Sequence, residues 1–161
     1  MLNYYPFALK LKDERILIIG GGVIAERKIR VLLSANAKIT VIAPRITEYL
    51  KELVNKSKII WFRKSVDETD IYGRKIVIAA TSDAGINRKI SKWCREENIW
   101  VNVVDNSYLS NFISPAIINI GKALLAVYTD AKNPVYSRDL KNFLKENWSE
   151  FLSYRRRLQD S

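Results

Sequence analysis

A chain of 161 residues, 48% of them hydrophobic, has room for one globular domain and a small appendage, and this composition excludes intrinsic disorder. The lack of histidine excludes a Ser–His–Asp triad and a His-ligated metal site, while the single cysteine, Cys94, excludes an intrachain disulfide and favours a reducing cytoplasm. The net charge of +10 is spread along the chain without a zinc-finger or RNA-binding signature, and no apolar run is long enough to span a bilayer, so we expect neither a nucleic-acid partner nor a membrane segment.

Residues 15–28 predict a buried strand, a glycine turn and the start of a helix. The apolar run of residues 16–19 is typical of a parallel strand that is covered on both faces. Gly20, Gly22 and Ala25 then match the dinucleotide fingerprint G-x-G-x-x-G/A, in which the first glycine permits a tight turn and the second lets the backbone approach a pyrophosphate. A glycine-rich turn without a ligand is the alternative, because this fingerprint alone is weakly specific.

Strand and helix patterns alternate beyond this stretch. We expect the first helix to run to about Ser34, and further helices from Thr47 to about Val54 and over residues 84–96. Strands are expected over residues 38–43, 58–63, 75–80 and 99–104. Residues 66–72 are expected to form a short acidic turn or helix. This order predicts an α/β fold, a Rossmann-like parallel sheet with helices on both faces. Ligands of such sheets bind beyond the carboxyl ends of the strands, here residues 20–22, 43–45, 80–83 and 104–106.

The pattern changes after Asp105. We expect short strands over residues 112–113, 116–120 and 123–128, the last two joined by a turn at Gly121-Lys122. Pro134 precedes one long helical pattern that runs to the C-terminus. The chain is therefore divided into a Rossmann domain, residues 1–113, and a small α+β segment, residues 114–161, which needs a partner surface because it is too small to build a core alone.

Several short motifs follow one another in a characteristic order. They are Gly20-Gly21-Gly22-x-x-Ala25-x-Arg27-Lys28, Val41-x-Ala43-Pro44, Ile78-Ala79-Ala80-Thr81-x-Asp83 with Asn87, Val101-Asn102-Val103-Val104-Asp105, and Phe112-Ile113-x-Pro115-Ala116. From about Tyr5 to Leu144 the chain resembles the precorrin-2 dehydrogenase family, which includes the N-terminal half of siroheme synthase. The resemblance implies NAD-dependent oxidation of precorrin-2 to sirohydrochlorin, on the way to siroheme or cobalamin-type tetrapyrroles. It also implies a homodimer in which the segment after the Rossmann domain makes the dimer and lines the active-site cleft.

The resemblance also implies the site residues. Asp105 would be catalytic, as the acceptor of a proton from the macrocycle; without the family match, an aspartate that caps the next turn would be the simpler interpretation. Asn102 is expected to fix the strand end or the cofactor loop. The implied cofactor contacts are Gly20, Gly22, Val23, Ile24, Pro44, Arg45, Thr81 and Asp83, and no residue is assigned to a metal. The basic composition suits a substrate with many carboxylates.

Two features depart from the expected patterns. A carboxylate for the ribose hydroxyls is expected about 20 residues after the glycines, but this chain has Pro44-Arg45, and Arg45 would suit the 2′-phosphate of NADP or be an exposed loop charge. Because the family generally lacks that carboxylate and uses NAD, we predict NAD. The family's Gly-Gly pair before the long helix is replaced by Asp130-Ala131, which puts substrate binding and chelatase activity in doubt more than NAD binding.

Three other functions stay open at this point. Some members of the family also insert ferrous iron, so the chain could be a ferrochelatase, with or without the dehydrogenase activity. It could instead be a regulatory module that binds NAD(H) without catalysis. It could also be a basic carrier that hands a tetrapyrrole to the next enzyme.

Overall fold

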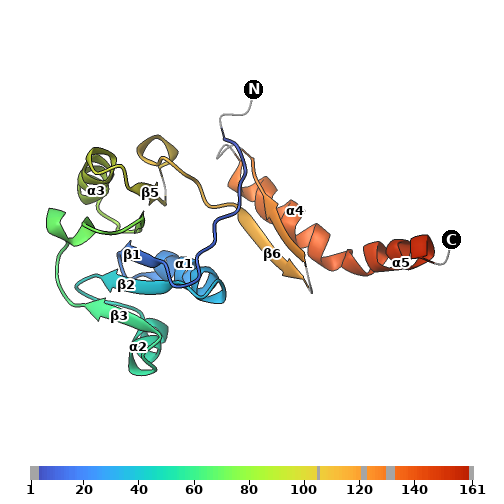
Figure 1. Cartoon of the computed structure of the whole chain (residues 1–161), viewed down its shortest axis with the longest axis horizontal. Helices are drawn as coiled ribbons and strands as arrows, with labels where there is room; N and C mark the ends of the chain where they lie inside the picture. The colour runs from blue at the N-terminus through green and yellow to red at the C-terminus, as the bar shows by residue number, and fades with distance from the viewer. Residues whose placement is uncertain (1–3, 105, 121–122, 130–132, 160–161) are drawn as a thin grey trace. The chain divides into compact units, whose positions relative to one another are not determined.

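The computed structural model describes residues 4–104, 106–120, 123–129 and 133–159. It separates into two compact units, one formed by Pro6–Ile113 and the other by Met1–Tyr5 with Ser114–Ser161 (Figure 1). The predictions made for Asp105, for the turn at Gly121-Lys122 and for the Asp130-Ala131 pair lie outside the described residues. Within the described part of the chain, no helix is both long and apolar enough to cross a membrane.

The larger unit is built on a five-stranded parallel sheet. Its elements are β1 (Arg15–Ile19), α1 (Val23–Ser34), β2 (Lys38–Ile42), α2 (Glu48–Asn55), β3 (Ile59–Phe62), η1 (Glu68–Ile71), β4 (Ile76–Ala79), α3 (Ala84–Glu96), β5 (Trp100–Val103) and η2 (Ser107–Leu109). The strand order is β3-β2-β1-β4-β5, so the chain builds outward from β1 to β3 and then returns to place β4 on the other side of β1. The carboxyl ends of β1 and β4 therefore lie at the point where the strand order reverses, which is where ligands bind in open α/β sheets.

Both faces of this sheet are buried. Ile16 and Ile18 of β1 belong to one hydrophobic cluster with residues of α1 and α2, whereas Leu17 and Ile19 belong to a second cluster with residues of α3 and η1. Successive strand side chains point to opposite faces, so burial of all four requires helices on each side. Figure 1 shows α3 on one side of the sheet and α1 with α2 on the other. The predicted Rossmann-like sheet with helices on both faces is confirmed.

The helices α2 and α3 begin where the sequence predicted. The Thr47 hydroxyl accepts a hydrogen bond from the Leu50 backbone N–H at 3.3 Å, and the Asp83 carboxylate accepts from the N–H groups of Gly85 and Ile86 at 2.7 and 3.0 Å. These side chains satisfy N–H groups of the first helical turn that have no carbonyl partner within the helix. Because β2 and β4 are both parallel to β1, the loops that follow them lie at the same edge of the sheet.

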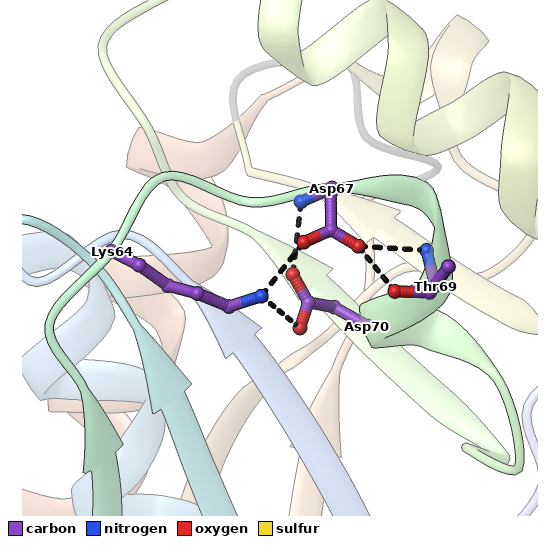
Figure 2. A network of polar contacts seen from close by, with 4 residues as sticks. All are labelled: Lys64, Asp67, Thr69 and Asp70. Carbon is purple, nitrogen blue, oxygen red and sulfur yellow. Dashed lines mark hydrogen bonds and ion pairs between the residues drawn. The ribbon is translucent and has the colours of Figure 1, made fainter.

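A compact charge network starts η1, where a short acidic turn or helix was predicted (Figure 2). The Asp67 carboxylate accepts from the N–H of Thr69 at 3.0 Å and also from its hydroxyl, and the Asp70 carboxylate accepts from the N–H of Asp67 at 2.9 Å. The Lys64 ammonium lies 2.7 Å from a carboxylate oxygen of each aspartate. Hydrogen bonds from Lys64 and then from the Thr69 hydroxyl lower the pKa of Asp67 to about 2.

Replacing Lys64 with glutamine is expected to flatten the acid dependence of stability. The folded-state pKa of Asp67 lies below its unfolded value of about 4, so the ionised carboxylate stabilises the fold above about pH 4, and this contribution is lost as the pH falls toward about 2. The difference in thermal midpoint between wild type and K64Q should therefore shrink below about pH 4. Lys58→Gln, for which the described residues offer no ion pair, is the control. A constant difference down to the lowest pH at which both fold would contradict this assignment.

The smaller unit contains a hairpin and two helices. Strands β6 (Ala116–Ile120) and β7 (Ala123–Val127) pair antiparallel, and α4 (Pro134–Glu146), which packs against them, is followed by α5 (Trp148–Gln159). The Asn133 side chain caps α4 by accepting a hydrogen bond from the Tyr136 N–H at 2.9 Å. Pro134 lies in the first turn of α4, where its missing backbone N–H costs no hydrogen bond, because an N–H at that position has no partner within the helix. The predicted strands over residues 116–120 and 123–128 are confirmed.

Two predictions about the chain after residue 105 are wrong. Residues 112–113 form no strand: the Phe112 carbonyl accepts instead from the Asn102 side chain at 3.1 Å. The expected single C-terminal helix is two helices that are separated at Asn147, whose side-chain amide donates to the Phe143 carbonyl at 2.9 Å beside its own backbone N–H at 3.0 Å. Asn147 thereby closes α4 as its C-cap.

Candidate nucleotide-binding site

The first turn of α1 faces open space. Gly22 is the N-cap of this helix, and among the described residues no side chain caps it, in contrast to α2 and α3. A Cβ built on Gly22 would meet no described atom within 4 Å. The backbone N–H groups that open α1 are thus left without the side-chain partner that α2 and α3 have. Together with the positive end of the helix dipole, they suit a phosphate group.

The other two glycines of the turn are required by close packing. Gly20 has φ +114°, and a Cβ on it would lie 2.3 Å from the Ala80 carbonyl oxygen. A Cβ on Gly21 would lie 2.3 Å from the Arg45 carbonyl oxygen. The glycine turn therefore touches the loops after β2 and β4, which only residues without a side chain permit. Gly21 was missed by the fingerprint, which treats its position as variable; the run of three glycines was the available signal.

The loop after β2, which carries Pro44 and Arg45, is tied to the glycine turn. The Thr47 N–H donates to the Gly21 carbonyl at 3.0 Å, and the Thr47 hydroxyl donates to the Glu26 carboxylate on α1 at 2.8 Å. Pro44 and Arg45 are both exposed, and among the described residues the Arg45 guanidinium has neither a hydrogen bond nor an ion pair. Arg45 is therefore free to meet an anion at the edge where β2 ends.

The loop after β4 is held by hydrogen bonds between Thr81 and Asn87. The Thr81 hydroxyl bonds the Asn87 side-chain oxygen at 2.7 Å, and the Asn87 amide donates back to the Thr81 carbonyl at 3.1 Å. Hydrogen bonds from the N–H groups of Ile86 and Gly85 lower the pKa of Asp83, so its carboxylate stays ionised while it caps α3. The structure thus uses the side chains of Thr81 and Asp83 to shape the loop. Asn87, to which sequence reasoning gave no role, holds Thr81 in place.

The remaining predicted site residues lie in the first turn of α1 or at β5, except Asp105, which lies outside the described residues. Val23 is 67% exposed and Ile24 half-buried, both in the first turn of α1. Asp105 itself lies outside the described residues; just before it, the Val104 N–H donates to the Ala79 carbonyl at 3.0 Å, which aligns the ends of β4 and β5. Asn102 is buried and, through its bond to Phe112, fixes the segment that follows β5.

Other chemistry finds little support in the described residues. Burial raises the pKa of the Cys94 thiol to about 12, so it is not a nucleophile at neutral pH. In the part of the chain that the structure covers, no group of three or more cysteine, aspartate or glutamate residues could hold a metal ion. The edge formed by the glycine turn and its two neighbouring loops is therefore the candidate site.

Comparisons with known proteins agree with this geometry. The model of the putative NAD(P)-binding family matches residues 7–116. The chain is 37% identical over 140 residues to siroheme synthase from Vesicomyosocius okutanii and 41% identical over 140 residues to siroheme synthase from Methylococcus capsulatus, in each case over 87% of this chain and 30% of the relative. It thus spans about a third of the length of these curated relatives.

A solved structure is similar over most of its own length. SirC, precorrin-2 dehydrogenase, superposes with a TM-score of 0.78 at 31% sequence identity, and the match covers 89% of this chain and 71% of that one. The match extends beyond residue 116, where the family model ends, because it covers a larger share of the chain than that model does. The chain therefore belongs to the precorrin-2 dehydrogenase family and carries that family's putative NAD(P)-binding domain.

Proposed function

We propose that this protein binds NAD at the carboxyl edge of its parallel sheet and oxidises precorrin-2 to sirohydrochlorin in siroheme biosynthesis. The observation that carries the cofactor assignment is the start of α1, whose N–H groups have no side-chain cap among the described residues and face open space at Gly22. The substrate assignment is supported by the similarity to SirC, precorrin-2 dehydrogenase, over 71% of that chain.

The proposed roles follow from what the oxidation requires. Bound NAD would supply the acceptor for a hydride, and the proton that leaves the macrocycle goes to a base, the role we assign to Asp105, which follows β5 in the sequence. The backbone of the first turn would hold the pyrophosphate, and the two neighbouring loops would line the rest of the cofactor. The residues assigned to cofactor binding are Gly20, Gly22, Val23, Ile24, Pro44, Arg45, Thr81 and Asp83.

NAD is proposed over NADP on the family resemblance, and Arg45 makes the choice testable. Its exposed guanidinium would pair with a 2′-phosphate if NADP were the cofactor. Titration with NADH and NADPH should give the tighter dissociation constant for NADH. Arg45→Ala should weaken NADPH binding more than NADH binding, because both cofactors reach this loop but only NADPH offers a 2′-phosphate to the side chain. Tighter binding of NADPH, lost in the variant, would assign NADP instead.

The activity assay separates the candidate functions. Precorrin-2 and NAD are incubated anaerobically with the protein, and NADH is followed by fluorescence while sirohydrochlorin is followed by its absorption spectrum. Formation of both products supports the dehydrogenase. Binding of NAD without formation of NADH would favour a regulatory module. Insertion of ferrous iron or cobalt into sirohydrochlorin, measured separately, decides whether the protein is also a ferrochelatase.

A homodimer is proposed through the smaller unit. Within its described residues Ile118 is the one hydrophobic residue that is buried, whereas large apolar side chains are exposed on β7, α4 and α5. They are Leu124, Val135, Tyr136, Phe143, Phe151, Leu152 and Tyr154. An apolar surface of this kind suits a second copy of the chain. The cytoplasmic location stays a prediction.

Replacing Phe143 with glutamate is expected to shift the protein from dimer to monomer. Phe143 is 59% exposed on α4, and a glutamate buried there in an apolar interface would carry a charge without a partner, which is costly. Light scattering after size-exclusion chromatography measures the mass. Phe62→Glu is the matched control, because Phe62 is 49% exposed in the larger unit and should leave the mass unchanged. A monomeric wild type, or equal shifts in both variants, would refute this interface.

A further inference from the structure

Glu26 lies in the first turn of α1 and connects this turn to the loop after β2. Its backbone N–H donates to the Gly22 carbonyl at 3.0 Å, and its carboxylate accepts from the Thr47 hydroxyl at 2.8 Å. The Thr47 N–H donates to the Gly21 carbonyl at 3.0 Å. These three hydrogen bonds form a closed ring that joins the glycine turn, the helix that follows it and the residue that caps α2.

The bond between Glu26 and Thr47 uses the hydroxyl in both directions. The Thr47 oxygen accepts from the Leu50 N–H at 3.3 Å, while its single hydrogen goes to the Glu26 carboxylate. The Glu26 side chain is only 17% exposed, so this hydrogen bond to a charged group is partly shielded from water. Hydrogen bonds to ionised groups are stronger than neutral ones, and shielding strengthens them further.

Arg30 holds the other oxygen of the same carboxylate. Its guanidinium donates twice to Glu26 Oε1, at 2.7 and 3.2 Å, and its Cζ lies 3.4 Å from the centre of the Tyr49 ring on α2. Hydrogen bonds from Arg30 and then from Thr47 lower the pKa of Glu26, so its carboxylate is ionised at neutral pH. One oxygen therefore binds the helix to which Glu26 belongs, and the other binds the loop after β2.

The loop that ends at Thr47 packs on the glycine turn. Ile46 is buried, and a Cβ built on Gly21 would lie 2.6 Å from its Cγ2. Pro44 and Arg45 precede it and are exposed. In open α/β sheets that bind dinucleotides, the residues at the end of the second strand meet the ribose of the adenosine half. The position of Pro44 and Arg45 therefore depends on how the loop is held at Thr47.

We propose that Glu26 is a positioning residue for the cofactor: by binding Thr47 it holds the Pro44-Arg45 loop against the glycine turn, where the adenosine half of the dinucleotide binds. This inference rests on the proposed binding of NAD, and it gives Glu26 no contact with the cofactor itself. A loop that is held in its binding conformation before the ligand arrives binds more tightly, because no ordering is needed at that moment. Alanine at position 26 would remove the acceptor of the Thr47 hydroxyl and release the loop.

The test measures the two halves of the cofactor separately. Glu26→Ala is expected to weaken NADH binding about tenfold and to raise the KM for NAD by a similar factor, with kcat at saturating NAD within about twofold of wild type. Reduced nicotinamide mononucleotide, which lacks the adenosine half, should bind the variant and the wild type within about twofold of each other. Glu26→Gln keeps an oxygen that accepts from Thr47 and should retain the NADH affinity within about threefold.

Glu14→Ala is the matched control. Glu14 is also a partly buried glutamate in an ion pair, 2.7 Å from Lys75, but it directly precedes β1 and so lies at the opposite edge of the sheet from the glycine turn. Its loss should lower the thermal midpoint without changing the NADH affinity. Thr47→Asp breaks the same bond as Glu26→Ala from the other side, because aspartate still caps α2 but cannot donate to a carboxylate, and it should weaken NADH binding about tenfold as well.

The outcomes separate this inference from the proposed function. A wild type that does not bind NADH overturns the cofactor assignment, whereas a wild type that binds it and a folded Glu26→Ala variant of equal affinity overturn only the positioning role. Equal losses for NADH and for the mononucleotide, or an equal loss in Glu14→Ala, also overturn it, because the effect would then be general. A full loss in Glu26→Gln would assign the effect to the ion pair with Arg30 and not to Thr47. If Glu26→Ala does not fold, unchanged NADH affinity in Thr47→Asp overturns the proposal.

Discussion

Replacing Asp105 with alanine is expected to lower the rate of NADH formation from precorrin-2 by about 10²- to 10⁴-fold, the range typical for loss of a general base. The oxidation needs an acceptor for the proton, and the chain has no histidine to substitute for the carboxylate. NADH affinity should stay within about threefold of wild type, because the proposed phosphate contacts belong to the glycine turn and to α1. Single-turnover measurements with saturating NAD separate the chemical step from binding.

Asp67→Ala is the control for this prediction. Asp67 is a carboxylate at the start of η1, bonded to Lys64 and Thr69, and we assign it no part in the site. Its loss should leave the rate unchanged. An Asp105→Ala variant that oxidises precorrin-2 at the wild-type rate would remove Asp105 from the chemistry, and a variant that no longer binds NADH would give it a structural role.

The second large effect is expected from the glycine turn, where Gly20→Ala should destabilise the fold and Gly22→Ala should not. A Cβ at position 20 would lie 2.3 Å from the Ala80 carbonyl oxygen, in a backbone conformation, φ +114°, that alanine rarely adopts. Strain and overlap together should lower the free energy of unfolding by about 3 kcal/mol or more. Position 22 has no described atom within 4 Å, so alanine fits there without overlap.

Gly22→Ala tests the phosphate site itself. Its Cβ would enter the space that we assign to the pyrophosphate, so NADH binding should weaken by about tenfold while the thermal midpoint stays near that of wild type. Denaturant unfolding and NADH fluorescence titration measure the two effects in parallel. Unchanged NADH affinity in a folded Gly22→Ala variant would move the cofactor away from this turn. Equal stability of Gly20→Ala and wild type would contradict the packing described here.

The regular elements of the larger unit follow closely from local patterns. The apolar run at residues 16–19 and the capping residues Thr47 and Asp83 predicted β1, α2 and α3 to within one or two residues. Buried strands and helices can be recognised in the sequence because the burial of successive side chains repeats with the period of the backbone. The alternation of strands and helices also predicted a parallel sheet with helices on both faces, which is confirmed, whereas the strand order came from the tertiary structure.

The failures lie where a single side chain decides the local path. The pair Phe112-Ile113 is apolar like a strand, but the Asn102 amide, ten residues earlier, takes the Phe112 carbonyl. Asn147 interrupts a helical pattern that continues on both sides of it, since a break of one residue barely disturbs the spacing of apolar positions. Neither hydrogen bond recurs at a regular spacing along the chain, so no periodic pattern in the sequence predicts it.

By itself, the sequence determined that the chain alternates strands and helices, that the turn after its first strand consists of glycines, and that its motifs are those of the precorrin-2 dehydrogenase family. Only the tertiary structure decided that Gly21 touches the Arg45 loop, that Asn87 locks Thr81, and that Glu26 binds Thr47. The physical reason is distance along the chain. Periodicity reports the environment of one element, whereas these contacts arise when strand order and turn geometry bring separated residues together.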